Sequence, residues 1–152
     1  MTEIEILLEK VKLESQLADY WHEVDTNWGK DAGRYYTEDA VFDGGEAIYH
    51  GRAKIQQFYS WRVARGPRAS VHAFTNYRTS FESDTRAVST WFMLLYAADG
   101  VPVLPTHPPI NIALVTDHME RQPSGEWLCS SRKFESIFLG GTPPTNPNLD
   151  DE

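Results

Sequence analysis

The sequence contains one cysteine and no cluster of basic residues, and both features narrow its function. Cys129 has no second cysteine with which to form an intramolecular disulfide or a thiolate metal site. We therefore read it as a small buried residue on a strand. The formal net charge is -8. Because this charge repels a phosphate backbone and no basic stripe offsets it, we expect no nucleic-acid partner.

Long apolar runs and cofactor motifs are also missing. The longest apolar stretches, such as Trp91 to Ala98, are too short to cross a bilayer, and the start MTEIEILLEK lacks the pattern of a signal peptide. We expect a cytoplasmic protein with no membrane partner. The chain has no Gly-rich phosphate loop, no dinucleotide fingerprint and no serine in a nucleophile elbow, which favours a reaction that needs no cofactor.

Aromatic side chains are what the sequence has in excess. Of its 152 residues, 41% are hydrophobic and 12% aromatic, so one domain can bury a core and still enclose an apolar cavity. We assign residues 1–139 to this single domain. The remainder, GGTPPTNPNLDDE at 140–152, has the proline, glycine and acid content of a disordered tail.

The order of the elements predicts an α+β fold. Apolar residues recur at helical spacing over residues 3–28, and Gly29 ends this long amphipathic helix. A short helix at 31–36, a hairpin around Gly44-Gly45 and a helix over 52–65 follow. Four strands complete the domain, at 69–82, 86–98, 110–121 and 126–138.

The strand at 86–98 is apolar on both faces. Phe92, Leu94 and Tyr96 share one face, whereas Trp91 and Met93 lie on the other. An antiparallel strand of this kind must be covered on both sides, and the helices can cover only one. We therefore expect the outer face of the sheet to pack against a second copy of the chain, in a homodimer or a higher homo-oligomer.

Asp25 places a carboxylate on what we take to be the buried stripe of the first helix. At about 100° per residue it projects with Leu7 and lies within about 60° of Val11, Ala18 and Trp21. Burying an unpaired charge is costly, so Asp25 should protonate or face a cationic or hydrogen-bonding partner. The alternative is that Asp25 lies near enough to the helix end to reach solvent or to bond locally.

His72 is the histidine that a strand would direct inward. It alternates with Phe74 and Asn76 on one face of the strand at 69–82, so it could face the helices. Taken alone, it is as readily a structural histidine. If Asp25 is its partner, the carboxylate fixes the imidazole tautomer and stabilises the protonated form, which makes His72 a base near neutral pH.

The order of elements and these residues together resemble the SnoaL-like branch of the NTF2-like proteins. The matching segments are ADYWHEVDTNWGKDAGRYYTEDAVF, SVHAFTNYR and EWLCSSRKF, and the resemblance covers nearly all of residues 3–138. It implies a cone-shaped α+β barrel, in which three helices pack in a curved, mixed and mainly antiparallel sheet. Hexachlorocyclohexane dehydrochlorinase, scytalone dehydratase and bile acid 7α-dehydratase belong to this branch.

The resemblance also implies catalytic residues. These enzymes use an acid at the end of the first helix and a histidine on the third strand, which Asp25 and His72 match in type and spacing. Some members use the residue five before the acid, here Tyr20, and an arginine on the last strand, for which Arg132 is the best candidate. By geometry alone, Tyr20 points about 140° away from Asp25 and would be a surface residue or lie on a second face of the helix. Arg132 alone could equally be a charge at a strand edge.

Two departures concern the substrate. The scytalone enzyme has tyrosines where this chain has Val24 and Gly44, so scytalone itself is a poor choice. Residues of the elements that would enclose the cavity are the expected substrate contacts: Trp21, Phe42, Tyr49, Phe58, Phe74 and Asn76. The segment VPVLPTHPP at 101–109 suits either a lid or an interface arm. The other histidines lack the spacing of a metal site, and we expect no metal.

These features predict a cofactor-independent lyase or isomerase that acts on a small hydrophobic molecule with a cyclic or aromatic frame. His72 would remove a proton from carbon, and Asp25 would orient His72 and stabilise its charge. Tyr20 or Arg132 would polarise a carbonyl or assist a departing hydroxide. Elimination of water is the first choice. The rival is a non-enzymatic protein that binds a hydrophobic ligand, or a structural subunit like the β-subunit of ring-hydroxylating dioxygenases.

Overall fold

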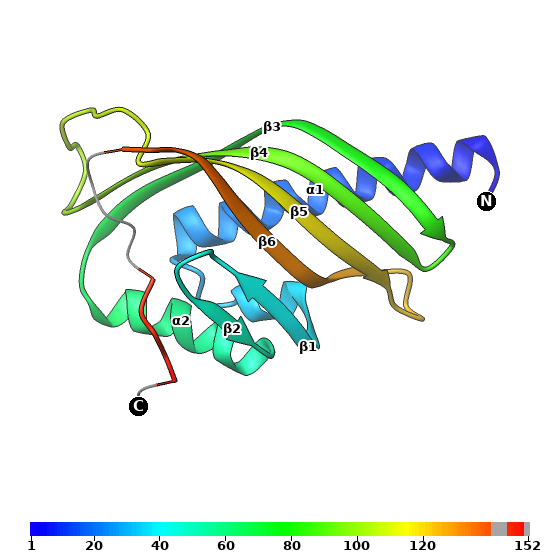
Figure 1. The fold of residues 1–152 in the computed structure, drawn as a ribbon, viewed down its shortest axis with the longest axis horizontal. Helices are drawn as coiled ribbons and strands as arrows, with labels where there is room; N and C mark the ends of the chain where they lie inside the picture. Colours follow the sequence, from blue (N-terminus) through cyan, green and yellow to red (C-terminus); the bar gives the residue numbers. More distant parts are fainter. Residues whose placement is uncertain (141–145, 151–152) are drawn as a thin grey trace.

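Two helices and a six-stranded sheet form the computed structural model, which describes residues 1–140 and 146–150 (Figure 1). The helices are α1 (Glu3–Asn27) and α2 (Arg52–Ala64), and the strands are β1 (Tyr36–Asp43), β2 (Ile48–His50), β3 (Arg68–Ser83), β4 (Arg86–Asp99), β5 (Asn111–Arg121) and β6 (Trp127–Leu139). The predicted α+β fold is confirmed. The short helix predicted at 31–36 is a single 3₁₀ turn, Ala32–Tyr35, and β1 already begins at the next residue.

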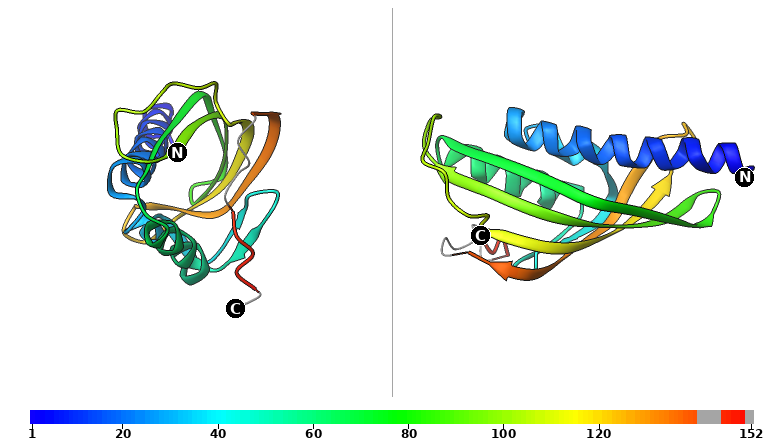
Figure 2. Two further views of the ribbon diagram at one scale, coloured as in Figure 1. Left: turned by 90° about the vertical axis from the view of Figure 1, so that its left-hand side faces the viewer. Right: turned by 90° about the horizontal axis from the view of Figure 1, so that it is seen from above.

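The sheet is mixed and strongly curved. Its strand order is β2-β1-β6-β5-β4-β3, in which β1 and β6 run parallel and the other neighbours antiparallel. Seen along the long axis of the molecule, the strands curve around one side while α1 and α2 lie on the other (Figure 2, left). Helix α1 packs beside β3, and α2 packs beside β1. In the described residues, neither helix has the length and apolar character needed to cross a membrane.

Both ends of α1 are fixed by local contacts. At the start, Thr2 Oγ1 accepts a hydrogen bond from the backbone N–H of Glu5 at 3.2 Å, and Glu5 Oε2 accepts one from that of Thr2 at 2.6 Å. At the end, Trp28 adopts a left-handed conformation with φ 57°. A Cβ on Gly29 would lie 2.4 Å from the ring of Tyr59, so glycine lets α1 end directly against α2.

The buried face of α1 differs from the predicted stripe. Leu7 and Val11 are 57% and 63% exposed, and Ala18 is also exposed. The helix carries two apolar stripes, and the sheet covers the one that contains Leu13 and Tyr20, which are both 1% exposed. The stripe predicted from periodicity is therefore wrong in its first half. Of the two positions that ideal helix geometry left open for Tyr20, the surface is wrong and the second face is what the structure shows.

An ion pair between Arg132 and Asp117 lies inside the cone. Arg132 Nε and Nη2 donate to the two oxygens of Asp117 at 2.8 and 3.0 Å, and Trp91 Nε1 donates to Asp117 Oδ2 at 2.9 Å. Burial opposes the charge of Arg132, but Asp117 and Tyr36 raise its pKa above the ordinary value. Because these residues stand on β4, β5 and β6, the network joins three adjacent strands. Arg132 is thus an inward-facing residue, and its reading as a strand-edge charge is wrong.

Residues 146–150 lie against the domain. Leu149 is 3% exposed, and the hydroxyl of Tyr49 donates to the backbone oxygen of Pro147 at 2.9 Å. Lys54 Nζ donates to the backbone oxygen of Leu149 at 3.3 Å. These residues belong to the segment predicted as a disordered tail; residues 141–145 and 151–152 of that segment lie outside the described residues.

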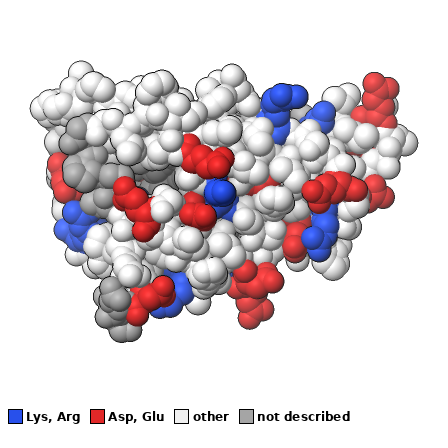
Figure 3. Space-filling view, in the orientation of Figure 1, with Lys and Arg blue, Asp and Glu red and all other residues white. Residues whose placement is uncertain are grey.

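The outer face of the sheet carries apolar side chains in register. Phe92 lies opposite Leu114, and Leu94 lies opposite Ile112, on the face turned away from the buried residues of β4. Tyr96, two residues further along, is 39% exposed. On the side of the molecule seen in Figure 3, the region of the loop between β4 and β5 at upper left carries no Lys, Arg, Asp or Glu. On the same face, Glu135 lies opposite Leu114 and Lys133 opposite Thr116, so the apolar patch on β4 and β5 has a charged border on β6. A patch of this kind suits contact with a second copy of the chain.

We predict that the outer sheet face holds copies of the chain together. The substitution Leu94→Lys places a charge in the middle of this face and should shift the protein toward the monomer, because an unpaired charge in an apolar interface is costly. Light scattering coupled to size-exclusion chromatography measures the effect. Leu8→Lys, at an exposed position (56%) on α1 and away from the outer sheet face, is the control. A wild-type protein that is itself monomeric would contradict the prediction.

We also predict that breaking the buried ion pair is costly to folding. In Asp117→Asn the guanidinium of Arg132 stays buried without its counter-charge, so the free energy of unfolding should fall by about 3–5 kcal/mol. Urea denaturation followed by circular dichroism measures the loss. Lys133→Gln changes an exposed charge on β6, the strand that carries Arg132. This substitution should alter the free energy of unfolding by no more than about 0.5 kcal/mol. Equal stability of the two variants would show that the pair does not stabilise the fold.

Candidate active site

Asp25 and His72, predicted as partners, form a hydrogen-bonded pair. His72 Nδ1 lies 2.6 Å from Asp25 Oδ1, and the backbone N–H of His72 donates to Asp25 Oδ2 at 2.8 Å. Ser70 Oγ donates to Oδ1 at 2.9 Å. A carboxylate beside Nδ1 favours the tautomer with its proton on that nitrogen, which leaves Nε2 as the basic atom. The alternative in which Asp25 bonds only within its helix end is wrong.

The position of β3 in the sheet explains how one side chain makes these contacts. Strand β3 is the last strand of the sheet, so the backbone N–H of His72 has no strand neighbour on that side. Asp25, in the last turn of α1, accepts the hydrogen bond that a neighbouring strand would otherwise accept. Its side chain is 16% exposed, whereas that of His72 is 5% exposed. The carboxylate therefore lies at the rim of the cone and the imidazole lies inside it.

Trp21 holds the imidazole in place from its other side. The Trp21 and His72 rings are stacked, with centroids 4.0 Å apart and planes inclined by 1°. Burial lowers the pKa of His72, and Asp25 raises it, while Arg62 and Arg68 lower it further. The net result is a pKa below the ordinary histidine value. His72 is therefore neutral near neutral pH, which is the form that can accept a proton.

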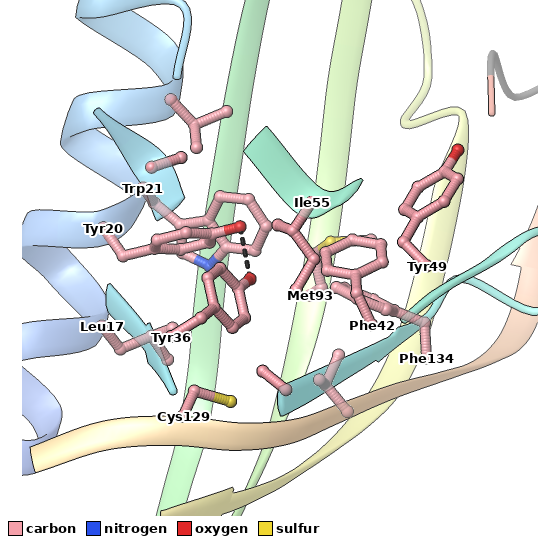
Figure 4. Packing of buried hydrophobic residues seen from close by; sticks show 14 of the residues in the cluster. Leu17, Tyr20, Trp21, Tyr36, Phe42, Tyr49, Ile55, Met93, Cys129 and Phe134 are labelled. Atoms are coloured by element: carbon pink, nitrogen blue, oxygen red, sulfur yellow. Dashed lines mark hydrogen bonds between the residues drawn. The ribbon is translucent and has the colours of Figure 1, made fainter. Parts of the chain in front are cut away.

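A small cavity lies beside His72 within the cone. Its volume is about 60 Å³, and its apolar wall includes three of the predicted substrate contacts: Trp21, Phe42 and Phe58. Met93, Leu95 and Phe134 complete that wall. Figure 4 shows how Trp21, Phe42, Met93 and Phe134 converge from the helix and the strands. Ligand pockets usually measure about 300–1,000 Å³, so the side chains around this cavity must move apart to admit a substrate.

Three other predicted contacts lie away from this cavity. Tyr49 stands behind Phe58, with ring centroids 4.9 Å apart. Phe74 packs against Trp91 at a centroid distance of 6.1 Å. Asn76 is exposed, with φ 55°, at an irregularity in the pairing of β3 with β4. The alternation predicted from His72 through Asn76 is wrong because this bulge turns Asn76 out of the inward face.

Tyr20 and Arg132 meet each other next to the cavity. The guanidinium of Arg132 lies 4.5 Å from the Tyr20 ring centroid, and its Nη1 donates to the hydroxyl of Tyr36 at 3.0 Å. Tyr36 donates in turn to Tyr20 at 2.6 Å (dashed line in Figure 4), and Tyr20 shares a hydrogen bond with Tyr59. Burial raises the pKa of all three tyrosines. They are therefore neutral hydroxyls that link Arg132 to Tyr59, which lines the cavity.

The sequence reading did not identify the polar part of the cavity wall. Arg62, Arg68, Asn111 and Tyr59 line the cavity, but none was singled out. The segment WRVARGPR at 61–68 was interpreted only as the end of a helix. Three arginines within seven residues of an acidic protein are an unusual local charge, and this was the available signal.

A larger groove lies on the other side of the pair, beneath residues 100–108. It encloses about 560 Å³, and Asp25, Trp28 and Arg68 contribute to its wall. Asp25 therefore faces the groove, His72 faces the cavity, and Arg68 lines both. Most of the segment 101–109, predicted as a lid or an interface arm, contributes to the wall of this groove; both roles stay predictions.

Metal ligation was the remaining chemistry to consider. Among the residues that the structure describes, His, Cys, Asp and Glu form no group of three or more that could hold a metal ion. The expectation of a metal-free and cofactor-free site stays a prediction.

Comparisons with solved structures agree with this fold. A protein from Novosphingobium aromaticivorans, proposed to be a scytalone dehydratase, is 17% identical with a TM-score of 0.82, over 97% of this chain and 96% of that chain. A Catenulispora acidiphila protein in complex with S-DNPA is 22% identical with a TM-score of 0.70, over 86% and 94%. A Nostoc punctiforme protein of unknown function with a cystatin-like fold is 16% identical with a TM-score of 0.69, over 85% and 91%. At such identities the likeness shows the fold alone.

Comparison with sequence families gives a more specific result. No curated protein sequence matches the chain. The model of the SnoaL-like domain matches residues 5–133, a range that contains both helices, the hydrogen-bonded pair and the wall of the cavity up to Asn111. The chain is therefore a member of the SnoaL-like domain family.

Proposed function

We propose that the protein is a cofactor-independent lyase or isomerase that acts on a small hydrophobic molecule with a cyclic or aromatic frame, and that it eliminates water. One observation supports this above the others. His72 lines a mainly apolar cavity with its Nδ1 bonded to Asp25, so Nε2 is left as the base. This arrangement is suited to removing a proton from carbon.

In the proposed reaction, Nε2 of His72 takes a proton from the carbon beside a carbonyl group. The electrons of the C–H bond form an enolate, and Asp25 stabilises the imidazolium that results. The enolate then re-forms the carbonyl as a carbon–carbon double bond forms and the C–O bond to the β-hydroxyl breaks. The hydroxide accepts the proton from Nε2 and leaves as water. If the proton were instead delivered to the other face of that carbon or to a different carbon, the reaction would be an isomerisation.

Tyr20 and Arg132 act through Tyr59 in this proposal. Neither lines the cavity beside His72, but Tyr59 does, and the hydroxyl chain connects them. The buried charge of Arg132 polarises this chain, so that the Tyr59 hydroxyl is a better donor to a substrate oxygen. We therefore regard Tyr20 and Arg132 as positioning residues.

Membership of the SnoaL-like domain family and the likeness to a protein proposed to be a scytalone dehydratase support the elimination. The complex of another relative with a small molecule supports a ligand inside the cone. The rival is a protein of the same fold that binds a hydrophobic ligand without changing it, or a structural subunit of a larger complex. In either case the contact between Asp25 and His72 would have no role in turnover.

We predict that His72→Gln and Asp25→Asn each lower turnover by about 10²–10⁴-fold while the protein stays folded, because each removes part of the general base. The assay screens β-hydroxy ketones on phenolic and polycyclic frames for loss of water in the wild type and then compares variants on the active substrate. His118→Gln, at an exposed position on β5, is the control. Turnover that is unchanged in both His72→Gln and Asp25→Asn would reject the base assignment.

A second prediction concerns the titration of His72. Burial and the nearby arginines hold its pKa below the ordinary value of about 6.5. Because Asp25 raises this pKa, Asp25→Asn should lower it further. Histidine side-chain NMR spectra of the wild type and of Asp25→Asn, recorded against pH, measure both values. A His72 pKa that rises in Asp25→Asn would show that the carboxylate does not stabilise the imidazolium.

A further inference from the structure

Two arginines share the cavity wall with the proposed base. Arg62 lies in the last turn of α2 and Arg68 at the start of β3, on either side of the turn at Gly66-Pro67. Both side chains line the cavity beside His72. Each lowers the pKa of His72, which is the effect of a positive charge close to the imidazole. The reaction proposed above assigns no role to either.

The positive charge of Arg62 and Arg68 is poorly compensated. No carboxylate of the described residues forms an ion pair with Arg62, whose partner is the Phe58 ring at 5.5 Å from the guanidinium carbon. Arg68 is paired with Asp99 at 3.6 Å, but the Asp99 side chain is 66% exposed, so solvent weakens this interaction. Burial, and then the charge of Arg62, lower the pKa of Arg68 to about 10.

A buried donor on Arg68 also lacks a partner. Its Nε is buried and makes no hydrogen bond, and the same holds for Oδ1 of Asn111 across the cavity wall. Unsatisfied buried polar groups cost about 1–3 kcal/mol each and call for an explanation. The ion pair of Arg132 with Asp117 shows that this fold can satisfy a buried guanidinium completely. By contrast, no carboxylate of the described residues pairs with Arg62, and Arg68 Nε has no acceptor although Asp99 lies near another nitrogen of the same guanidinium.

We propose that the substrate carries a carboxylate and that Arg62 and Arg68 bind it at the polar end of the cavity beside His72. This inference rests on the proposed function, because it names the substrate class of the same site. Guanidinium groups bind carboxylates through paired hydrogen bonds, which would satisfy Arg68 Nε and supply the acceptor that Arg62 lacks. The apolar frame of the substrate would then lie against Phe42, Phe58 and Met93.

The inference gives the two arginines separate roles in approach and in binding. Arg68 lines the large groove as well as the cavity, so an anion in the groove meets Arg68 first. Arg62 lines the cavity but not the groove and reaches the anion only inside. A net charge of -8 for the whole chain makes these two residues a local exception that would select for an anionic ligand.

Binding of benzoate and of its neutral analogue benzamide to the full chain tests the inference. NMR titration should show that the wild type prefers benzoate by about tenfold or more, as expected for hydrogen bonds to a charged group. Shifts of the Met93 methyl and the His72 ring would place the ligand in the cavity. In the double variant Arg62→Gln, Arg68→Gln the preference should fall to about twofold or less, because benzamide binding depends little on the charge. If the two substitutions only damaged the cavity, the binding of benzoate and that of benzamide would weaken equally.

The control is Arg86→Gln. Arg86 lies at the start of β4, is exposed and pairs with Glu120 at 4.0 Å, so its substitution should leave the benzoate preference intact. If the double variant does not fold, each single Gln variant should lose part of the preference, whereas Arg62→Lys should retain more of it. Equal affinity of the wild type for both ligands, including no detectable binding of either, would overturn the inference. So would a preference that survives the double substitution.

The same titration separates this inference from the proposed reaction. His72→Gln removes the base but leaves both arginines, so it should bind benzoate with the wild-type preference even though turnover is lost. A protein that prefers benzoate but shows no dependence of turnover on His72 would refute the reaction and keep the binding site. A protein whose turnover depends on His72 but that shows no preference for benzoate would refute the binding site and keep the reaction.

Discussion

The carboxylate of Asp25 closes the free edge of β3, and the site is arranged around that contact. The two oxygens accept hydrogen bonds from the backbone and side chain of His72 and from Ser70, so one group fixes the strand edge and the imidazole at once. The end of α1 must then be held at a set distance from β3. The left-handed Trp28 and the close approach of Gly29 to Tyr59 provide this. The geometry of the pair is therefore a property of how α1 ends.

The interior of the cone contains one buried arginine, Arg132, and two partly buried ones, Arg62 and Arg68, and they differ in how their charges are paired. Arg132 is fully paired with Asp117, and the tyrosine chain occupies the remaining space around it. A closed network of this kind makes a region rigid. Arg62 and Arg68 surround open volume and lack such partners. The open volume beside His72 is thus larger than that beside the network, as a site that admits a ligand requires.

Much of the fold and the central pair could be predicted from the sequence, because both are encoded in order and spacing. The strands and the long helix were predicted to within a few residues, since apolar periodicity and glycine turns mark their ends. Asp25 and His72 are 47 positions apart, and only their match to a known family connected them. Periodicity could not show which of two apolar stripes on α1 the sheet would cover, nor the bulge that turns Asn76 outward.

The arginines of the cavity could not be predicted for a different reason. A charged side chain at a helix end is ordinarily solvated, so the arginines at 62–68 indicate a local positive charge in the sequence but not a place in a cavity wall. The position of Arg62 in the cavity wall follows from α2 lying against the concave side of the sheet (Figure 2). The burial of Tyr20 could not be predicted for the same reason. Aromatic residues of other elements surround its ring, and a projection of α1 alone does not include them.

Asp25 and His72 also lie on opposite sides of one wall. The carboxylate borders the open groove and the imidazole borders the closed cavity. A charge that keeps contact with solvent avoids most of the cost of dehydration, and a base that is dry is not competed for by water. The edge of a single strand thus separates a solvated counter-ion from a buried base, so the carboxylate that charges the imidazole does not share the cavity with the substrate.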